Sequence, residues 1–350
     1  MVVSIDFSRP VWVYGAGSFG RAVAAALQKQ GATLSGFISA KNPGSEIDGL
    51  PVVAPQAASG QVAIGVFSRE NPYPDIAATC AAAGLDDLHW PMTYYPALAA
   101  DLGWRYWLGA QDTFATKASD IEKACSLLSD DQSRANFRGI ISFRQGDNPG
   151  YAGHLDDEPQ YFPPFLTKAL PAEPTFVDCG AFDGDTYRAF SELATKHTAI
   201  LFEPEPTNFA ALVANLRATA NTNTVLTIPL AVSDRHRTLY FSGDGEAAGA
   251  SEKGIPVVAV SLDDTIHRPI HYLKMDIEGA EADALNGGRR VISEYRPIIA
   301  ISLYHKQADL WELPLLVNDI VEGYAYFIRQ HSHNSFESVL YAMPRERLST

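Results

Sequence analysis

The chain has 350 residues, of which 46% are hydrophobic and 19% are charged, a composition typical of soluble globular proteins with room for two domains. Its net charge of −14 argues against a nucleic-acid surface, because phosphate contacts require clustered Lys and Arg. The three cysteines have neither metal-binding spacing nor the even number of a disulfide framework. With no secretory-type N-terminus and no apolar run of about 18 residues, we expect a cytoplasmic protein without nucleic-acid or membrane partners.

The first motif is a glycine turn near the N-terminus. Residues 11–20, VWVYGAGSFG, predict a strand and a turn, and 21–30 predict the helix that follows. The turn has the spacing of a nucleotide-binding loop, formed by Gly15, Gly17, Ser18 and Gly20. The next predicted strand, 34–38, ends in Ser-Ala-Lys and not in the acid that binds the ribose of NAD. This argues against a nicotinamide cofactor.

The stretches YGAGSFGRAV, GFIS, DGLPVVAP and VAIGVFSR continue an α/β pattern. Together they resemble the small Rossmann-like domain at the start of PglD-type sugar acyltransferases, over roughly residues 11–90. The resemblance implies that an N-terminal domain, 1–110, binds a nucleotide sugar. The alternative is a domain used only for packing or for dimerisation, which would make the protein a homo-oligomer.

Residues 111–170 are less regular, and we expect a helical and loop linker that caps the site of the acceptor, the substrate of the domain that follows. Residues 121–137 read as one amphipathic helix, and 145–164 read as a loop. Aromatic residues at a domain junction often line a ligand cleft, although packing in the core is the commoner role. The candidates for such a cleft are Tyr151, His154 and Tyr161.

The catalytic half, 171–350, begins with the stretch FVDCGAFDGDT at 176–186. It predicts a buried strand, a glycine turn and a helix, with Asp185 or Thr186 as a candidate helix cap. About 25 residues later, ILFEPEP predicts a strand with Glu203 at its carboxyl tip. An acid at that position suits the hydroxyl groups of a ribose.

The acids around this second turn favour a cationic ligand. Asp178, Asp183 and Asp185 would repel a pyrophosphate, whereas S-adenosylmethionine carries a sulfonium and an ammonium. The alternative is an ordinary turn whose acids are solvated or cap the helix. We therefore expect S-adenosylmethionine as the cofactor.

The motifs FVDCGAFDGDT, FEPEPTNF, LAVSD, VSLDD, LKMDIEGAE and RPIIAISLYH follow one another in the order found in FkbM-type S-adenosylmethionine-dependent methyltransferases. This resemblance covers roughly residues 161–344, with Phe182 where many members carry Asn. It implies a class I, Rossmann-like seven-stranded sheet and O-methylation. The cofactor-binding residues it implies are Asp178, Gly180, Ala181, Phe182, Asp183, Gly184, Thr186, Glu203, Pro204, Ser233 and Asp276.

Further strands are predicted at 225–230, 238–242, 257–260, 271–275 and 298–303, with a closing antiparallel pair at 324–329 and 338–342. In an open α/β sheet the carboxyl ends of the strands share one crevice. We therefore expect convergence of Asp178, Glu203, Asp276 and His305.

Methyl transfer to a hydroxyl requires removal of a proton, and His305 is the first candidate for this base. Asp276 and Glu278 are alternatives, which could also orient the acceptor or, with His305, hold a divalent cation. An isolated D-x-E pattern is weak evidence for a metal, so we expect none. His331 and His333 could belong to the same crevice.

The predicted function is methylation of a hydroxyl on a sugar, a glycan or a related metabolite. One alternative is a non-catalytic scaffold that binds nucleotide sugars. Another is an NAD-dependent oxidoreductase, which would use the N-terminal glycine turn.

Overall fold

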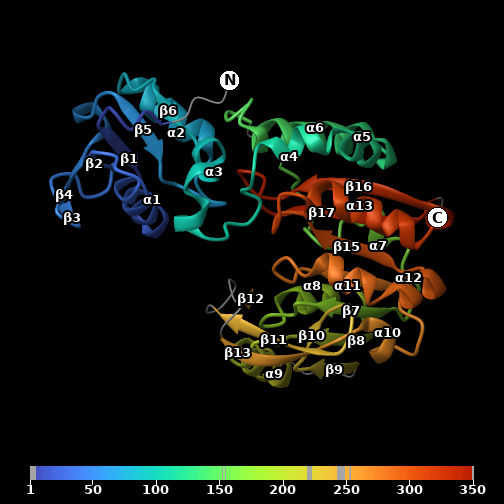
Figure 1. The fold of residues 1–350 in the computed structure, drawn as a ribbon. Coiled ribbons are helices and arrows are strands. Elements are labelled where there is room, and N and C mark those ends of the chain that lie inside the picture. The colour runs from blue at the N-terminus through green and yellow to red at the C-terminus, as the bar shows by residue number, and fades with distance from the viewer. Residues whose placement is uncertain are drawn as a thin grey trace. The chain divides into compact units, whose positions relative to one another are not determined.

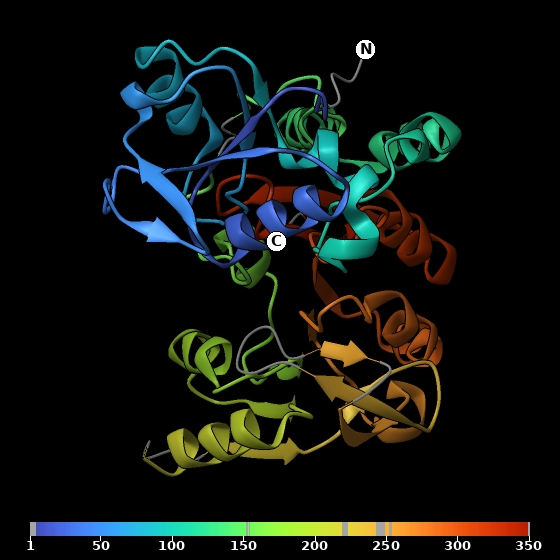
Figure 2. The ribbon, with the colours of Figure 1, turned by 60° about the vertical axis from the view of Figure 1, so that its left-hand side comes forward.

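The computed structural model describes residues 5–151, 153, 155–218, 223–242, 249–251 and 254–348. The chain divides into two compact units, shown from two directions in Figures 1 and 2. Unit 1 comprises Met1–Ile121, Ala135–Leu155 and Gln330–Glu337, and unit 2 comprises Glu122–Arg134, Asp156–Arg329 and Ser338–Thr350. The expected linker 111–170 is thus shared between the units, and a short piece of the expected catalytic domain folds with unit 1.

Unit 1 contains a six-stranded sheet in which β1 pairs in parallel with both β2 and β5. The strands, in spatial order, are β3 (Glu46–Ile47), β4 (Leu50–Val53), β2 (Leu34–Ile38), β1 (Val11–Tyr14), β5 (Gln61–Ile64) and β6 (Leu88–His89). Its helical segments before residue 110 are α1 (Ser18–Lys29), η1 (Pro55–Ala57), α2 (Tyr73–Ala82) and α3 (Pro91–Leu102). The smaller N-terminal α/β fold is therefore confirmed.

The single helix predicted over 121–137 is wrong. The structure has α5 (Ala118–Leu127) and α6 (Asp131–Gln145), preceded by the short α4 (Asp112–Thr116). The chain breaks between them because the backbone N–H of Ser129 donates to the carbonyl of Tyr326 (2.8 Å), and Asp130 accepts the N–H of Ser133 (2.7 Å). An Asp that accepts from the residue three positions later starts a new helix.

Unit 2 is organised around a seven-stranded sheet. Its strands, in spatial order, are β16 (Tyr324–Gln330), β17 (Ser338–Pro344), β15 (Ile298–Ser302), β14 (Tyr272–Met275), β7 (Thr175–Cys179), β8 (Thr198–Phe202) and β9 (Thr224–Ile228). From β15 to β9 neighbouring strands are parallel, and β17 is antiparallel to β15. The expected class I methyltransferase sheet with its antiparallel ending is confirmed.

Two of the predicted strands lie outside this sheet. They belong to a separate four-stranded sheet, seen in gold in Figure 2, with the order β10 (Ala231–Val232), β13 (Ile255–Val260), β11 (Arg237–Ser242) and β12 (Gly249–Ser251). Val257 and Ala259 of β13 are buried, whereas Ile255 and Val258 are 52% and 40% exposed. This alternation is typical of a sheet covered on one face, unlike the fully buried central strands.

The helices of unit 2 connect these strands. They are α7 (Pro164–Thr167), α8 (Asp185–Leu193), α9 (Pro206–Ala218), α10 (Leu262–Thr265), α11 (Glu281–Asn286), α12 (Arg289–Tyr295), α13 (Asp309–Ile320) and η3 (Arg345–Arg347). Every residue of β7, β14 and β15 is buried, and Phe176 of β7 stacks on Phe190 of α8 with ring centroids 4.5 Å apart. Within the described residues, no helix is both long and apolar enough to cross a membrane.

Candidate active site

The glycine turn after β7 packs directly against the end of β14. Gly180 has a φ of +88°, and a Cβ added there would lie 2.0 Å from the backbone oxygen of Asp276. Only glycine suits such a position. The N–H groups of Gly180 and Ala181 both donate to the carbonyl of Phe202, at 3.0 and 2.9 Å. The turn is therefore bound to β8 and β14 at their carboxyl ends.

Glu203 connects this turn to the end of β8. Its Oε2 accepts the N–H of Phe182 and its Oε1 accepts the N–H of Glu205, both at 2.9 Å. Phe182 has a φ of +47°, a strained value that Asn would tolerate better. Burial raises the pKa of Glu203, which is 5% exposed and followed by the half-buried Pro204. The side chain of Asn208 also hydrogen-bonds to Glu203, and these three contacts leave part of the carboxylate's capacity of about four lone pairs for a ligand hydroxyl.

Asp178 is paired with a cation that the sequence reasoning missed. Nζ of Lys274, on β14, lies 2.9 Å from Oδ1 of Asp178 and donates to the carbonyl of Gly180 at 2.6 Å. Burial opposes the lysine charge, but Asp178 and Asp276 outweigh burial and raise the pKa of Lys274 to about 12. A single Lys within the apolar strand segment YLKM was the available signal. One of the three acids expected to repel a pyrophosphate is therefore neutralised.

The other two acids organise the beginning of α8. Asp183 accepts the N–H of Asp185 (3.1 Å) and a hydrogen bond from the side chain of Asn215 to its backbone oxygen (2.9 Å). Asp185 accepts the N–H of Thr186 at 2.6 Å. Gly184, with a φ of +89°, is the residue at the helix N-cap, so neither Asp185 nor Thr186 occupies it. Both carboxylates therefore stabilise the start of α8 through backbone hydrogen bonds, whether or not they also contact a ligand.

Asp276, at the end of β14, accepts hydrogen bonds from two tyrosines. The hydroxyl of Tyr161 donates to Oδ2 (2.9 Å), and that of Tyr304 donates to Oδ1 (3.3 Å). Tyr161, one of the predicted cleft residues, therefore lies at the site. Tyr151 belongs to unit 1, and His154 lies outside the described residues. Asp276 retains a side-chain exposure of 25%, so a ligand can reach it.

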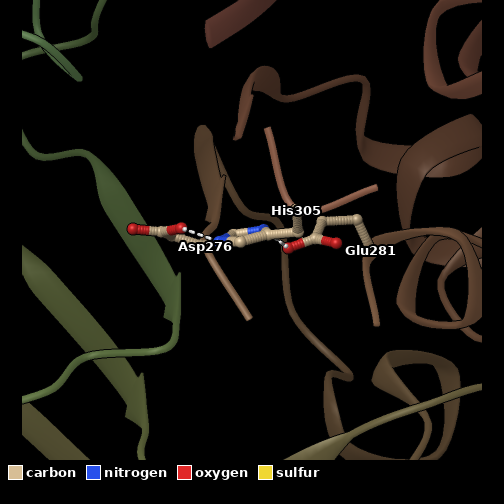
Figure 3. Close-up of side chains that lie close together, drawn as sticks. All are labelled: Asp276, Glu281 and His305. Carbon is tan, nitrogen blue, oxygen red and sulfur yellow. Dashed lines mark hydrogen bonds and ion pairs between the residues drawn. The ribbon is translucent and has the colours of Figure 1, made fainter. Parts of the chain in front are cut away.

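His305, which follows the end of β15, lies between carboxylates on both sides (Figure 3). Its Nδ1 is 2.9 Å from Oε1 of Glu281, and its Nε2 is 3.3 Å from Oδ1 of Asp276 and 3.7 Å from Oε1 of Glu278. Burial alone would lower its pKa, but these carboxylates outweigh burial and raise the pKa of His305 to about 10. The imidazole is fully buried, and Asp276 and Glu278 beside it keep 25% and 20% of their side chains exposed. His305 as the general base stays a prediction.

Glu281, the first residue of α11, was not predicted as a site residue. Its Oε1 accepts the N–H groups of Ile277 (2.9 Å) and Gly279 (3.4 Å) in addition to its contact with His305. It therefore shapes the turn after β14, where Glu278 has a φ of +53°. The signal in the sequence was a second acid three positions after Glu278, at the start of a helix.

The remaining predicted residues are Ser233, His331 and His333. Ser233 is fully buried after β10, where its N–H donates to the carbonyl of Val260 at 2.9 Å. His331 and His333 lie in the segment that folds with unit 1, whereas Asp276 belongs to unit 2.

The N-terminal glycine turn has one open position. A Cβ added to Gly15 or Gly20 would lie 2.7 Å from Val66 or 2.0 Å from the carbonyl oxygen of Gly15, whereas one added to Gly17 would meet no described atom within 4 Å. Gly17 and Ser18 are exposed, and no described side chain caps α1. The turn can therefore receive a ligand at the helix N-terminus.

Comparison with known proteins supports the fold. Residues 178–337 match the family described as the methyltransferase FkbM domain. The crystal structure of a methyltransferase FkbM from Methylobacillus flagellatus is similar with a TM-score of 0.74 and 19% identity, over 95% of this chain and 89% of that one. At this identity the likeness shows the fold.

A curated relative, the 2-O-methyltransferase NoeI of Sinorhizobium fredii, is 26% identical over an alignment of 151 residues, and the match covers 35% of this chain. The chain spans about three fifths of that relative's length, 61%. The resemblance of residues 11–90 to PglD-type acyltransferases stays a prediction. We conclude that the C-terminal half of the chain contains a region, residues 178–337, that matches the methyltransferase FkbM domain.

Proposed function

We propose that the protein is an S-adenosylmethionine-dependent O-methyltransferase that acts on a hydroxyl of a sugar or glycan. The observation that carries this proposal is the meeting of two features at the carboxyl edge of one sheet. The glycine turn joined to Glu203 lies at the ends of β7 and β8, and the cluster around Asp276 lies at the ends of β14 and β15. The relative that methylates an oxygen supports the choice of acceptor atom.

The residues present fit S-adenosylmethionine. Glu203 offers acceptor lone pairs to ribose hydroxyls, and the N–H groups of Gly180, Ala181 and Phe182 are already occupied within the protein. A turn with those N–H groups occupied offers little to a pyrophosphate. When bound, S-adenosylmethionine supplies a methyl group on a positively charged sulfur. Carboxylates near the turn would favour that charge.

We assign removal of the acceptor proton to the pair Asp276 and Glu278. Both retain exposure, with side chains 25% and 20% accessible, and His305 beside them is fully buried. The hydroxyls of Tyr161 and Tyr304 and the imidazolium of His305 hold the Asp276 carboxylate in place. His305 is therefore a positioning residue in this proposal, fixed in turn by Glu281.

The test is methyl transfer from labelled S-adenosylmethionine to a panel of sugars, glycans and nucleotide sugars, with formation of S-adenosylhomocysteine as the second readout. Loss of a catalytic base should lower turnover by about 10²–10⁴-fold, so Asp276→Asn and Glu278→Gln identify which carboxylate acts. Both variants should keep cofactor affinity if their role is confined to the acceptor. Binding of NAD without binding of S-adenosylmethionine or S-adenosylhomocysteine would contradict the proposal.

We also propose that unit 1 binds the sugar acceptor in its nucleotide-linked form. The open position at Gly17 supports this, together with a series of aromatic contacts that begins in the turn at Phe19. Ring centroids lie 5.6 Å apart for Phe19–Phe67, 6.3 Å for Phe67–Tyr106 and 4.8 Å for Trp104–Tyr106. Trp104 is 49% exposed, and exposed aromatic faces suit sugars and bases.

A non-catalytic scaffold is the remaining alternative. It would bind the nucleotide sugar at unit 1 and transfer no methyl group to any acceptor. Tight binding of S-adenosylmethionine together with its turnover, even slow turnover, would argue against this alternative.

A further inference from the structure

Three carboxylates and one imidazole meet at the carboxyl ends of β14 and β15. Ligand atoms of Asp276, Glu281 and His305 lie within 4.8 Å of one another (Figure 3), and Glu278 lies beside them. Imidazole and carboxylate groups together suit first-row divalent cations such as Mn²⁺ and Zn²⁺. We propose that this cluster binds a divalent cation in exchange for the Nε2 proton of His305, through Nε2 and the carboxylate of Asp276, with Glu278 as a further ligand.

The distances around the imidazole differ on its two sides. Nε2 lies 3.3 Å from Asp276 and 3.7 Å from Glu278, longer than the ordinary hydrogen-bond distance of about 2.9–3.0 Å. Two ligands of one cation, each about 2.1 Å from it, lie about 3–4 Å apart. The distances from Nε2 to the carboxylates of Asp276 and Glu278 are therefore those expected between ligands of one ion.

The other side of the ring supports the same assignment. Nδ1 lies 2.9 Å from Oε1 of Glu281, which is hydrogen-bond distance, and this fixes the ring with Nε2 facing Asp276. Histidines that bind metals are commonly oriented by such a carboxylate on their second nitrogen. Glu281 therefore supports the ligand in this site.

The charge of the cluster calls for a cation. Lys274, which is paired with Asp178, also attracts Asp276, so Lys274 and His305 together face four carboxylates, those of Asp178, Asp276, Glu278 and Glu281. In addition, Oε2 of the fully buried Glu281 has no hydrogen-bond partner in the part of the chain that the structure describes. Glu281 lies on the Nδ1 side of the ring, so it would not contact an ion at Nε2, but its charge adds to the negative charge that a cation offsets.

The site is open on one side only. Asp276 and Glu278 keep 25% and 20% of their side chains exposed, whereas His305 and Glu281 are fully buried. An ion held by three protein groups keeps positions for water or for oxygens of another molecule. An acceptor hydroxyl at such a position would lose its proton more readily. This last step rests on the proposed function, but binding of the cation by the free protein does not.

The experiment titrates Mn²⁺, Zn²⁺ and Mg²⁺ into the chelator-treated full-length protein, by calorimetry and by the electron paramagnetic resonance of Mn²⁺. We expect one ion per chain. His305→Gln and Asp276→Asn should weaken binding by at least about 100-fold, because even supporting residues are worth about 10–100-fold. His197→Gln is the matched control: His197 is also buried, but its ring contacts the hydroxyl of Tyr187 (3.0 Å) and the carbonyl of Ala194 (2.6 Å).

Absence of binding by the wild type, or equal binding by wild type, His305→Gln and Asp276→Asn, would overturn the site. Circular dichroism verifies that each variant is folded. If His305→Gln or Asp276→Asn does not fold, Glu278→Gln, at a partly exposed position, takes its place in the titration. Titration of S-adenosylhomocysteine into the same samples separates the two proposals. A protein that binds the cation but not this ligand would retain the metal site and lose the proposed methyltransferase function.

Discussion

The two glycine turns share a strand–turn–helix plan, yet they meet their surroundings differently. In the N-terminal turn, Gly17 and Ser18 are exposed and no described side chain caps the helix that follows. In the turn after β7, the N–H groups of Gly180 and Ala181 donate to Phe202, and that of Phe182 donates to Glu203. The glycines allow the same backbone path in both, but the neighbouring groups decide whether an anion or a cation is favoured.

The largest expected effect is structural. Gly180→Ala would place a Cβ 2.0 Å from the backbone oxygen of Asp276 at a φ of +88°, so both a clash and backbone strain arise. We expect a loss of about 3 kcal/mol or more in the free energy of unfolding of unit 2. Denaturant unfolding monitored by circular dichroism measures this loss.

The matched control is Gly17→Ala. Gly17 has a φ of −75°, and its added Cβ would meet no described atom within 4 Å. Stability should change by no more than about 0.5 kcal/mol. Equal destabilisation by the two substitutions would show that the turns are packed alike and would end the distinction drawn between them.

The second expected effect concerns the ligand of unit 2. Glu203→Gln keeps the size of the side chain but removes its charge, so charged hydrogen bonds to a ribose are weakened. We expect affinity for S-adenosylmethionine to fall by about 10–150-fold, equivalent to about 1.5–3 kcal/mol. Calorimetry with S-adenosylmethionine and S-adenosylhomocysteine measures it. Unchanged affinity would remove Glu203 from the cofactor site and leave it only as the link between Phe182 and Glu205.

The smallest and most selective effect concerns unit 1. Nucleotide sugars should raise the thermal midpoint of the wild type, since a ligand at 100 times its Kd stabilises the native state by about 2.7 kcal/mol. Gly17→Val fills the open position, so the shift should disappear while binding of S-adenosylmethionine is retained. If uridine-, guanosine-, cytidine- and thymidine-diphosphate sugars shift neither protein, unit 1 is better regarded as structural.

Much of unit 2 was predictable from local patterns. Apolar runs marked β7, β8, β14 and β15, because a strand buried on both faces is apolar along most of its length. The convergence of Asp276 and His305 followed from the shared edge of a parallel sheet. The same logic failed for residues 238–242 and 257–260, since period-two patterns do not say which sheet a strand joins.

The electrostatic environment of His305 was beyond any local pattern. It depends on Glu281 and Asp276, which come from 24 and 29 positions earlier in the chain and approach the two ring nitrogens from opposite sides. The pairing of Lys274 with Asp178 likewise joins residues 96 positions apart on neighbouring strands. Charge states in a buried cluster depend on every neighbour, so they follow only from the folded arrangement.

The sequence by itself determined the order of elements, both glycine turns and the methyltransferase character of the second half, because these depend on local residue types and their spacing. Only the tertiary structure decided that Glu281 completes the cluster, that His305 lies between carboxylates on both sides, and that residues 330–337 fold with unit 1. The physical reason is one of distance. Electrostatic and packing energies are set by separations of a few ångströms, which residues far apart in the chain acquire only on folding.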